Sequence, residues 1–296
     1  MSIVDERKRL SRDAKRRYAS AAFVTLLLLS VFWPSPVVSS NRLWFGERLA
    51  VDELSFLGRE APSWDVAFWF FAGLLLLAIL QSAESYEWRV VAFRRPSVRH
   101  ALIALLVGGV LTAGVWLAID RPLLAWAEAA QSDRTEATIR IMNRLGGGMN
   151  PPLIVLFFLI AGVCYRERRW VAYAVAMAIS GLTAGILAQI VKHLVGRARP
   201  ELWLGPAHYA PGSSTSFPSG HTVGAFAIAG VLMFASRNRP LRVVAFLLAL
   251  AVGLSRVFAF RHWGSDVFAS MTLGLAAAWL AVEIVIPLTP VSAARP

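Results

Sequence analysis

Eight stretches of mostly apolar residues run through the 296-residue chain, and they limit its fold more than any other feature. They cover about residues 18–38, 64–83, 100–119, 151–165, 170–191, 221–235, 241–258 and 265–286. A helix needs roughly 20 such residues to cross the hydrocarbon core of a bilayer. The stretches at 151–165 and 221–235 are short, and each needs a turn of flanking residues to reach that length. The sequence therefore predicts an all-α, polytopic bundle of transmembrane helices.

The composition agrees with this prediction and excludes other classes of protein. Hydrophobic residues make up 57% of the chain and charged residues 16%, against about 45–50% and 25% in soluble domains. Lys and Arg outnumber Asp and Glu by 30 to 18, which gives a net charge of +12. A nucleic-acid-binding protein would need a water-exposed basic face, and so apolar a composition leaves little room for one. The single cysteine, Cys164, excludes an internal disulfide framework.

The distribution of the basic residues predicts an orientation in the membrane. If all eight segments span and the amino terminus is cytoplasmic, 18 of the 30 basic residues fall in cytoplasmic loops. Tight basic clusters such as those at 166–169 and 236–242 are typical of that side. We therefore expect an integral protein of the bacterial inner membrane with both termini in the cytoplasm. Residues 18–38 also resemble a secretory signal, although two prolines interrupt the approach to a cleavage site.

Two further patterns concern the packing of helices. Residues 120–150 predict one or two amphipathic helices outside the membrane, with an apolar side made by Leu123, Leu124, Trp126, Ile139, Met142 and Leu145. Gly181 and Gly185 are spaced like the small residues of closely packed membrane helices, and so are Ser270, Gly274 and Ala278. Chance explains these spacings equally well, because Gly and Ala are common in this chain.

Polar residues gather in three short segments, which all fall on the predicted extracytoplasmic face. The segments are 192–200 (KHLVGRARP), 218–221 (PSGH) and 255–266 (SRVFAFRHWGSD). The orientation rests on the basic residues of the other loops. The convergence of the three segments on one face is therefore independent support for it.

The types of residue in these segments predict a site for phosphate. Lys192, Arg199 and Arg256 supply three permanent positive charges where helices leave the membrane. The planar guanidinium fork suits phosphate oxygens, and lysine adds a point charge. Ser219 and Gly220 stand just before a helix, where free backbone N–H groups favour an anion. Any one of these cations, taken alone, is equally consistent with a side chain that extends to the membrane surface.

Three other residues predict chemistry on that phosphate. His262 and Asp266 are four residues apart and lie on one face of a helix. A carboxylate in this position can hold the far nitrogen of the imidazole, fix its tautomer and raise its basicity. His262 is therefore a candidate nucleophile, and His221, on another helix, is the candidate general acid for the leaving oxygen. A single histidine at a helix end is more often structural than catalytic, so the prediction depends on the combination.

The combination is highly specific. Eleven residues occur in order within about 75 positions and fit the patterns K-x6-R-P, P-S-G-H and S-R-x5-H-x3-D. With these motifs the chain resembles the type 2 phosphatidic acid phosphatases, which are integral-membrane lipid phosphatases. Arg197, Arg261 and His193 fall outside the patterns, and we expect structural roles for them.

The resemblance covers about residues 100–286 and implies a division of the chain. Residues 100–296 would form a phosphatase core of six transmembrane helices, with an outer helical segment between the first and the second. Residues 1–99 lie outside the resemblance, and their two apolar stretches predict an amino-terminal extension with two further transmembrane helices.

The resemblance also implies a role for each motif residue. The phosphate-binding residues would be Lys192, Arg199, Ser219, Gly220 and Arg256. His262 would be the nucleophile that forms a phosphohistidine, oriented by Asp266, and His221 would donate the proton. No metal or other cofactor is implied, and no cluster of carboxylates beyond Asp266 is expected on that face.

The leading functional hypothesis is metal-independent hydrolysis of a lipid phosphate or polyprenyl diphosphate at the extracytoplasmic face. Undecaprenyl diphosphate, phosphatidylglycerol phosphate, phosphatidic acid and lipid A all stay open as substrates. A lipid-to-lipid phosphotransferase would use the same intermediate. A transporter would place ionisable residues in the middle of the membrane, and the predicted spans hold essentially none away from their ends.

Overall fold

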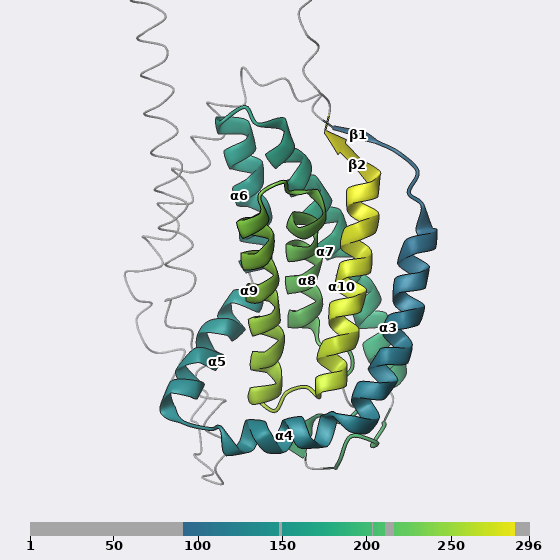
Figure 1. Ribbon diagram of the computed structural model, residues 1–296, viewed down its shortest axis with the longest axis vertical. Coiled ribbons are helices and arrows are strands. Elements are labelled where there is room, and N and C mark those ends of the chain that lie inside the picture. Colours follow the sequence, from purple (N-terminus) through teal and green to yellow (C-terminus); the bar gives the residue numbers. More distant parts are fainter. Residues whose placement is uncertain (1–90, 148–149, 203, 211–215, 288–296) are drawn as a thin grey trace, which may run out of the picture. The chain divides into compact units, whose positions relative to one another are not determined.

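The computed structural model describes residues 91–147, 150–202, 204–210 and 216–287 (Figure 1). The predicted segments 18–38 and 64–83, and most of the predicted extension 1–99, lie outside the described residues. The division at residue 99 therefore stays a prediction.

Six apolar helices of the described residues correspond to the other six predicted segments. They are α3 (Val98–Ala118), α6 (Asn150–Cys164), α7 (Arg168–Val195), α8 (Gly220–Ala235), α9 (Arg239–Phe258) and α10 (Gly264–Ile284). Four of them, α3, α7, α9 and α10, are long and apolar enough to cross a membrane, whereas α6 and α8 are shorter. The prediction of a helical bundle with membrane-spanning helices is thus confirmed for this part of the chain.

Helix α8 lies at the centre of the bundle and packs against α7, α9 and α10 (Figure 1). Its inward residues Phe226 and Val231 are fully buried, as are Ala278 and Ala281 of α10. The outer helices instead expose large apolar side chains, as in α3, where Leu106 is 71% exposed. Apolar exposure on this scale suits contact with lipid rather than with water.

One of the two sets of small residues is a packing face. A Cβ atom added at Gly274 would lie 2.8 Å from the carbonyl oxygen of Val223 and 2.9 Å from the backbone nitrogen of Ala227, both in α8. The backbones of α8 and α10 therefore touch at this point. At Gly181 and Gly185 the same position is open space, so the spacing on α7 has no packing role within the described residues.

The segment between α3 and α6 forms two helices, α4 (Asp120–Ala129) and α5 (Asp133–Gly146), in agreement with the prediction for residues 120–150. Helix α4 crosses one end of the bundle (Figure 1). Its buried Ala127 packs with Val257 and Val267. The ring of Trp126 meets Phe258 edge to face with centroids 4.9 Å apart.

A short antiparallel sheet departs from the all-α prediction. Strand β1 (Val91–Phe93) pairs with β2 (Val285–Pro287), with Ala92 opposite Ile286. The predicted helix 265–286 therefore ends earlier, at Ile284. Ile286 directly precedes Pro287, a position that disfavours the helical conformation, and it lies in the strand. The side chain of Arg94 ties the sheet to α10 through an ion pair of 2.9 Å with Glu283.

The contact at Gly274 yields a test of the packing. Gly274→Leu should destabilise the protein by about 1–3 kcal/mol or more, because its side chain must displace the backbone of α8. The matched control is Gly109→Leu, at a helical position where an added Cβ meets nothing within 4 Å. Unfolding in detergent micelles measures the effect, and equal stability of the two variants would contradict the close crossing.

Candidate active site

The structure brings the predicted site residues together at the end of the bundle that α4 crosses. Lys192 lies in the last turn of α7, Arg256 in the last turn of α9, and Asp266 in the first turn of α10. Ser219 caps α8, and Gly220 and His221 begin it. The positive charges of Lys192, Arg199 and Arg256 all act on His221, which places these residues around one site.

The chain turns back at the end of α7 because Gly196 adopts a left-handed conformation, with φ at 59°. Its N–H donates to the carbonyl of Lys192 at 3.1 Å, a common way to end a helix. Beyond it, the N–H of Ala198 donates to the carbonyl of His208 at 2.9 Å. The turn thus keeps Arg199 at the same end of the bundle as Lys192.

His262 is held in the short loop between α9 and α10, where it is 3% exposed. Its Nδ1 lies 2.6 Å from the carbonyl oxygen of Ser216. A carbonyl oxygen can only accept a hydrogen bond, so Nδ1 carries the proton and Nε2 keeps a free lone pair. This is the tautomer that a nucleophilic Nε2 requires.

The contact between His262 and Asp266 is less direct than the sequence predicts. Nδ1 lies 3.8 Å from Oδ2 of Asp266, which is beyond hydrogen-bond distance. The carboxylate oxygen instead accepts from the hydroxyl of Ser216 at 2.5 Å and from the N–H of Trp263 at 2.9 Å. Ser216 therefore links the two residues, with its carbonyl on the imidazole and its hydroxyl on the carboxylate.

Burial lowers the pKa of His262 to about 4, and the charges of Arg256 and Lys192 act in the same direction. Asp266 opposes the shift without reversing it. The imidazole is thus neutral near pH 7, with its lone pair available.

Arg197 holds Asp266 from the other side. Its guanidinium, 2% exposed, forms ion pairs of 2.5 Å with Asp266 and 2.7 Å with Asp120 of α4. Asp120 in turn accepts bonds of 2.7 Å from both the N–H and the hydroxyl of Ser265. The shared arginine thus brings one further carboxylate, that of Asp120, into the site, although no motif includes it. Arg197, which falls outside the motifs, has a place in the site after all.

The outer helix α5 also contributes to the site. Asn143 accepts a hydrogen bond of 2.6 Å from Arg256 and one of 3.3 Å from the hydroxyl of Ser255. Just beyond α5, a Cβ added at Gly147 would collide with Nε2 of His221 and lie 2.9 Å from its Cδ2. Only a glycine lets the backbone come so close to this histidine.

The cationic residues differ in how many of their N–H groups have hydrogen-bond or ion-pair partners. The Nε of Arg256 is buried and has no hydrogen-bond partner among the described residues. Glu201 accepts from Arg199 at 3.3 Å and forms an ion pair of 2.9 Å with Arg261. Such a set of guanidinium groups at one place suits an oxyanion with several oxygens.

Ser219 is more firmly tied to the fold than the sequence predicts. Its backbone N–H donates to the hydroxyl of Ser270 at 2.8 Å, and its own hydroxyl accepts from Thr222 at 2.9 Å. The first N–H groups of α8, beginning at the exposed Gly220, remain for an anion. Within the described residues, no group of three or more His, Cys, Asp or Glu side chains is placed to hold a metal.

Comparison with known proteins shows which family this arrangement resembles. Residues 169–289 match the family model of the PAP2 superfamily. The chain is 40% identical over 108 residues to the lipid A 1-phosphatase of Rhizobium johnstonii, an alignment that covers 33% of this chain and 41% of that one. It is 30% identical over 133 residues to phosphatidylglycerophosphatase B of Bacillus subtilis, covering 42% and 62%.

The fold agrees with that of a solved PAP2 structure. The transmembrane PAP2-type phosphatidylglycerolphosphate phosphatase of Bacillus subtilis superposes with a TM-score of 0.50 and 23% identity, over 61% of this chain and 93% of that one. The chain is thus an integral membrane protein with a PAP2 fold. All three motifs lie within the residues that match the PAP2 family model, whereas Asp120 and Asn143 precede them.

Asp120 yields a test of the buried network. Asp120→Asn should lower the free energy of unfolding by about 3 kcal/mol, because it removes one partner of a buried ion pair. The control is Glu136→Gln, which breaks the exposed pair with Arg140, where about 0–1 kcal/mol is expected. Denaturant unfolding in micelles compares the two variants. Equal effects would mean that Asp120 adds no more than a surface charge.

Proposed function

We propose that the protein hydrolyses phosphate monoesters of membrane lipids through a phosphohistidine on His262, without a metal ion. The observation that carries the proposal is the state of this imidazole: it is buried, neutral and protonated on Nδ1, and cations surround it. A nucleophile in this state attacks most readily an electrophile that the cations bind, and phosphate meets that condition.

In the first step, Nε2 of His262 attacks phosphorus while the bond from phosphorus to the lipid oxygen breaks. Lys192, Arg199 and Arg256 bind the phosphoryl oxygens and offset the negative charge of the transition state. The bound phosphate dianion offsets the positive charges that act on His221, so this imidazole is protonated in the complex and gives its proton to the departing lipid oxygen. Nδ1 keeps its proton, and the carbonyl of Ser216 stabilises the positive charge that develops on the ring.

In the second step, water hydrolyses the phosphohistidine. His221, which lost its proton in the first step, takes one from the attacking water. The oxygen of that water joins phosphorus, the bond from phosphorus to Nε2 breaks, and inorganic phosphate leaves. Both histidines then regain their starting states, so the cycle needs no other reactant.

The names of the two curated relatives support a lipid phosphate as the substrate class, since one acts on lipid A and the other on phosphatidylglycerol phosphate. The site also lies where α7 and α9 end, at the predicted boundary between lipid and water. Because the chain covers 41% and 62% of these relatives, the substrate is part of the proposal.

We further propose that the site faces away from the cytoplasm. The basic clusters at 166–169 and 236–242 lie at the opposite helix ends, where α7 and α9 begin. Clusters of this kind stay on the cytoplasmic side during insertion.

Phosphate release from a panel of lipids tests the function. With phosphatidic acid, phosphatidylglycerol phosphate or lipid A, the purified protein should release phosphate, and His262→Ala should reduce the rate about 10³-fold or more. His221→Ala should reduce it about 10²–10⁴-fold. The control is His193→Ala, an exposed histidine next to Lys192, which should match the wild-type protein.

A radiolabelled donor lipid separates the possible reactions. Label on the protein that survives base but not acid indicates a phosphohistidine, and its absence in His262→Ala assigns the residue. Label in free phosphate indicates hydrolysis, whereas label in a second lipid indicates transfer. Full activity of His262→Ala would refute the mechanism.

The low pKa of His262 makes a separate prediction. Only the neutral ring can attack, so the active form persists above the folded pKa and is lost as the pH falls through about 4. Titration of histidine-labelled protein by NMR, without substrate, should show a ring with a pKa near 4 whose signal is missing from His262→Asn. A value for His262 near the ordinary 6.5 would contradict the burial that the structure gives it.

A further inference from the structure

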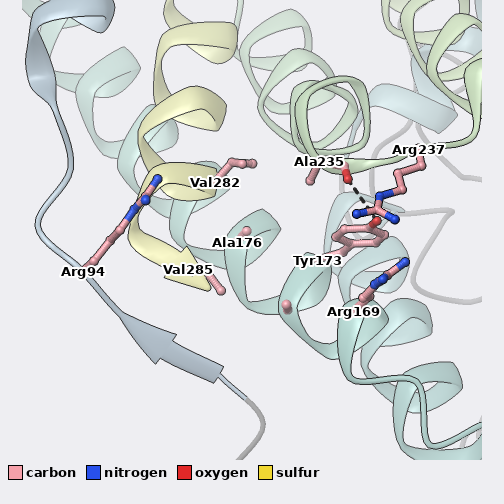
Figure 2. Close-up of a pocket in the computed structure, with 9 residues that line it drawn as sticks. Arg94, Arg169, Tyr173, Ala176, Ala235, Arg237, Val282 and Val285 are labelled. Carbon is pink, nitrogen blue, oxygen red and sulfur yellow. Dashed lines mark hydrogen bonds between the residues drawn. The ribbon is translucent and has the colours of Figure 1, made fainter. Parts of the chain in front are cut away.

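A cationic pocket lies at the other end of the bundle from the candidate active site. It has a volume of about 340 Å³ (Figure 2). Arg169, in its wall, and Lys192 of the active site are roughly 23 residues apart on α7, which is about 35 Å at 1.5 Å per residue. That separation is close to the thickness of a bilayer core, about 30 Å, so the two sites belong to opposite faces.

Cationic and apolar groups divide the lining of the pocket. Three arginines, one tyrosine and five small apolar residues form it: Arg94, Arg169, Arg237, Tyr173, Ala172, Ala176, Ala235, Val282 and Val285. Figure 2 shows Arg169 and Arg237 near the ring of Tyr173 on one side, with Arg94 on the other side beyond Val285. No described lining residue is acidic.

The three arginines differ in their partners. Arg94 is fixed by Glu283. The Nε of Arg94 donates to the backbone carbonyl of Glu283 at 2.6 Å, and the guanidinium forms an ion pair of 2.9 Å with the Glu283 carboxylate. Arg169 and Arg237 are exposed, and neither has a hydrogen bond or an ion pair with another described residue. The positive charges of both arginines interact with Tyr173. The hydroxyl of Tyr173 donates to the carbonyl of Ala235 at 3.2 Å. Two unpaired cations therefore converge on one polar wall.

We propose that this pocket binds the phosphate head group of an anionic phospholipid in the leaflet opposite the candidate active site. Guanidinium groups bind phosphate oxygens through paired hydrogen bonds, and basic pockets between transmembrane helices suit such head groups. The volume lies at the small end of the roughly 300–1,000 Å³ of ligand sites, which fits a head group better than a whole lipid. Free phosphate offers the same charge, but only a lipid also covers the apolar floor at Ala176, Val282 and Val285.

This binding is independent of the proposed hydrolysis. Phosphatidylglycerol is a suitable probe, because its phosphate is a diester and phosphomonoester hydrolysis does not consume it. Its binding can be measured whether or not the protein proves to be a phosphatase.

The test is a lipid titration of the full chain in neutral detergent, followed by native mass spectrometry. Phosphatidylglycerol should occupy one site more tightly than zwitterionic phosphatidylcholine. The double variant Arg169→Gln/Arg237→Gln should weaken that site about tenfold or more, because two charge-assisted contacts are lost. Both side chains are exposed, so the fold should tolerate the change.

Two controls isolate the pocket. Arg99→Gln/Arg239→Gln removes the same charge from two exposed arginines that do not line it, and should bind phosphatidylglycerol like the wild type. Arg256→Gln alters the candidate active site and should also keep this binding. Equal weakening by both double variants would overturn the proposal. So would equal binding of phosphatidylcholine, or inorganic phosphate that displaces phosphatidylglycerol at comparable concentration, which would assign the pocket to a soluble ligand.

Discussion

The site depends on one buried guanidinium, that of Arg197. It lies between the carboxylates of Asp120 and Asp266, and all three side chains are almost completely buried. A lone charge in such surroundings would cost several kcal/mol, so each of the three is tolerable only beside the others. Because Asp120 belongs to α4 and Asp266 to α10, the network fixes the outer helix against the bundle and the bundle against the loop after α7.

The geometry of His262, the proposed nucleophile, follows from this network. Arg197 sets the position of Asp266, and Asp266 fixes the hydroxyl of Ser216. The carbonyl of Ser216 then selects the tautomer of His262. The chain of contacts also explains why the carboxylate need not touch the imidazole: its oxygens are occupied by groups that hold the loop, and the loop holds the ring. Arg197 and Ser216, which lie outside the motifs, thus help to position the motif residue His262.

The sequence could predict features that depend on residues close together in the chain, but not contacts between distant residues. The six helices and the motif residues were predictable because hydropathy and spacing are local signals. The expectation that His262 and Asp266 lie on one helix face was wrong, because α10 begins at Gly264 and His262 lies in the loop before it. Asp120, Asn143 and Ser216 carry no such signal. Asp120 lies 77 residues from Arg197, and Ser216 acts partly through a backbone carbonyl that every residue type has. The pairing of β1 with β2 joins residues nearly 200 positions apart, which no local pattern records.

The arginines near the two ends of α7 have different roles because they have different partners. At the end that holds the candidate active site, Arg256 is held by Asn143, and Arg199 contacts Glu201, so these guanidinium groups are positioned before a ligand arrives. Positioning of this kind lowers the cost of reorganisation when charge develops on a reacting phosphate. At the other end, Arg169 and Arg237 are exposed side chains that must lose rotamer freedom to hold a ligand. The first arrangement suits a transition state of fixed geometry, and the second suits a head group that exchanges with the surrounding lipid.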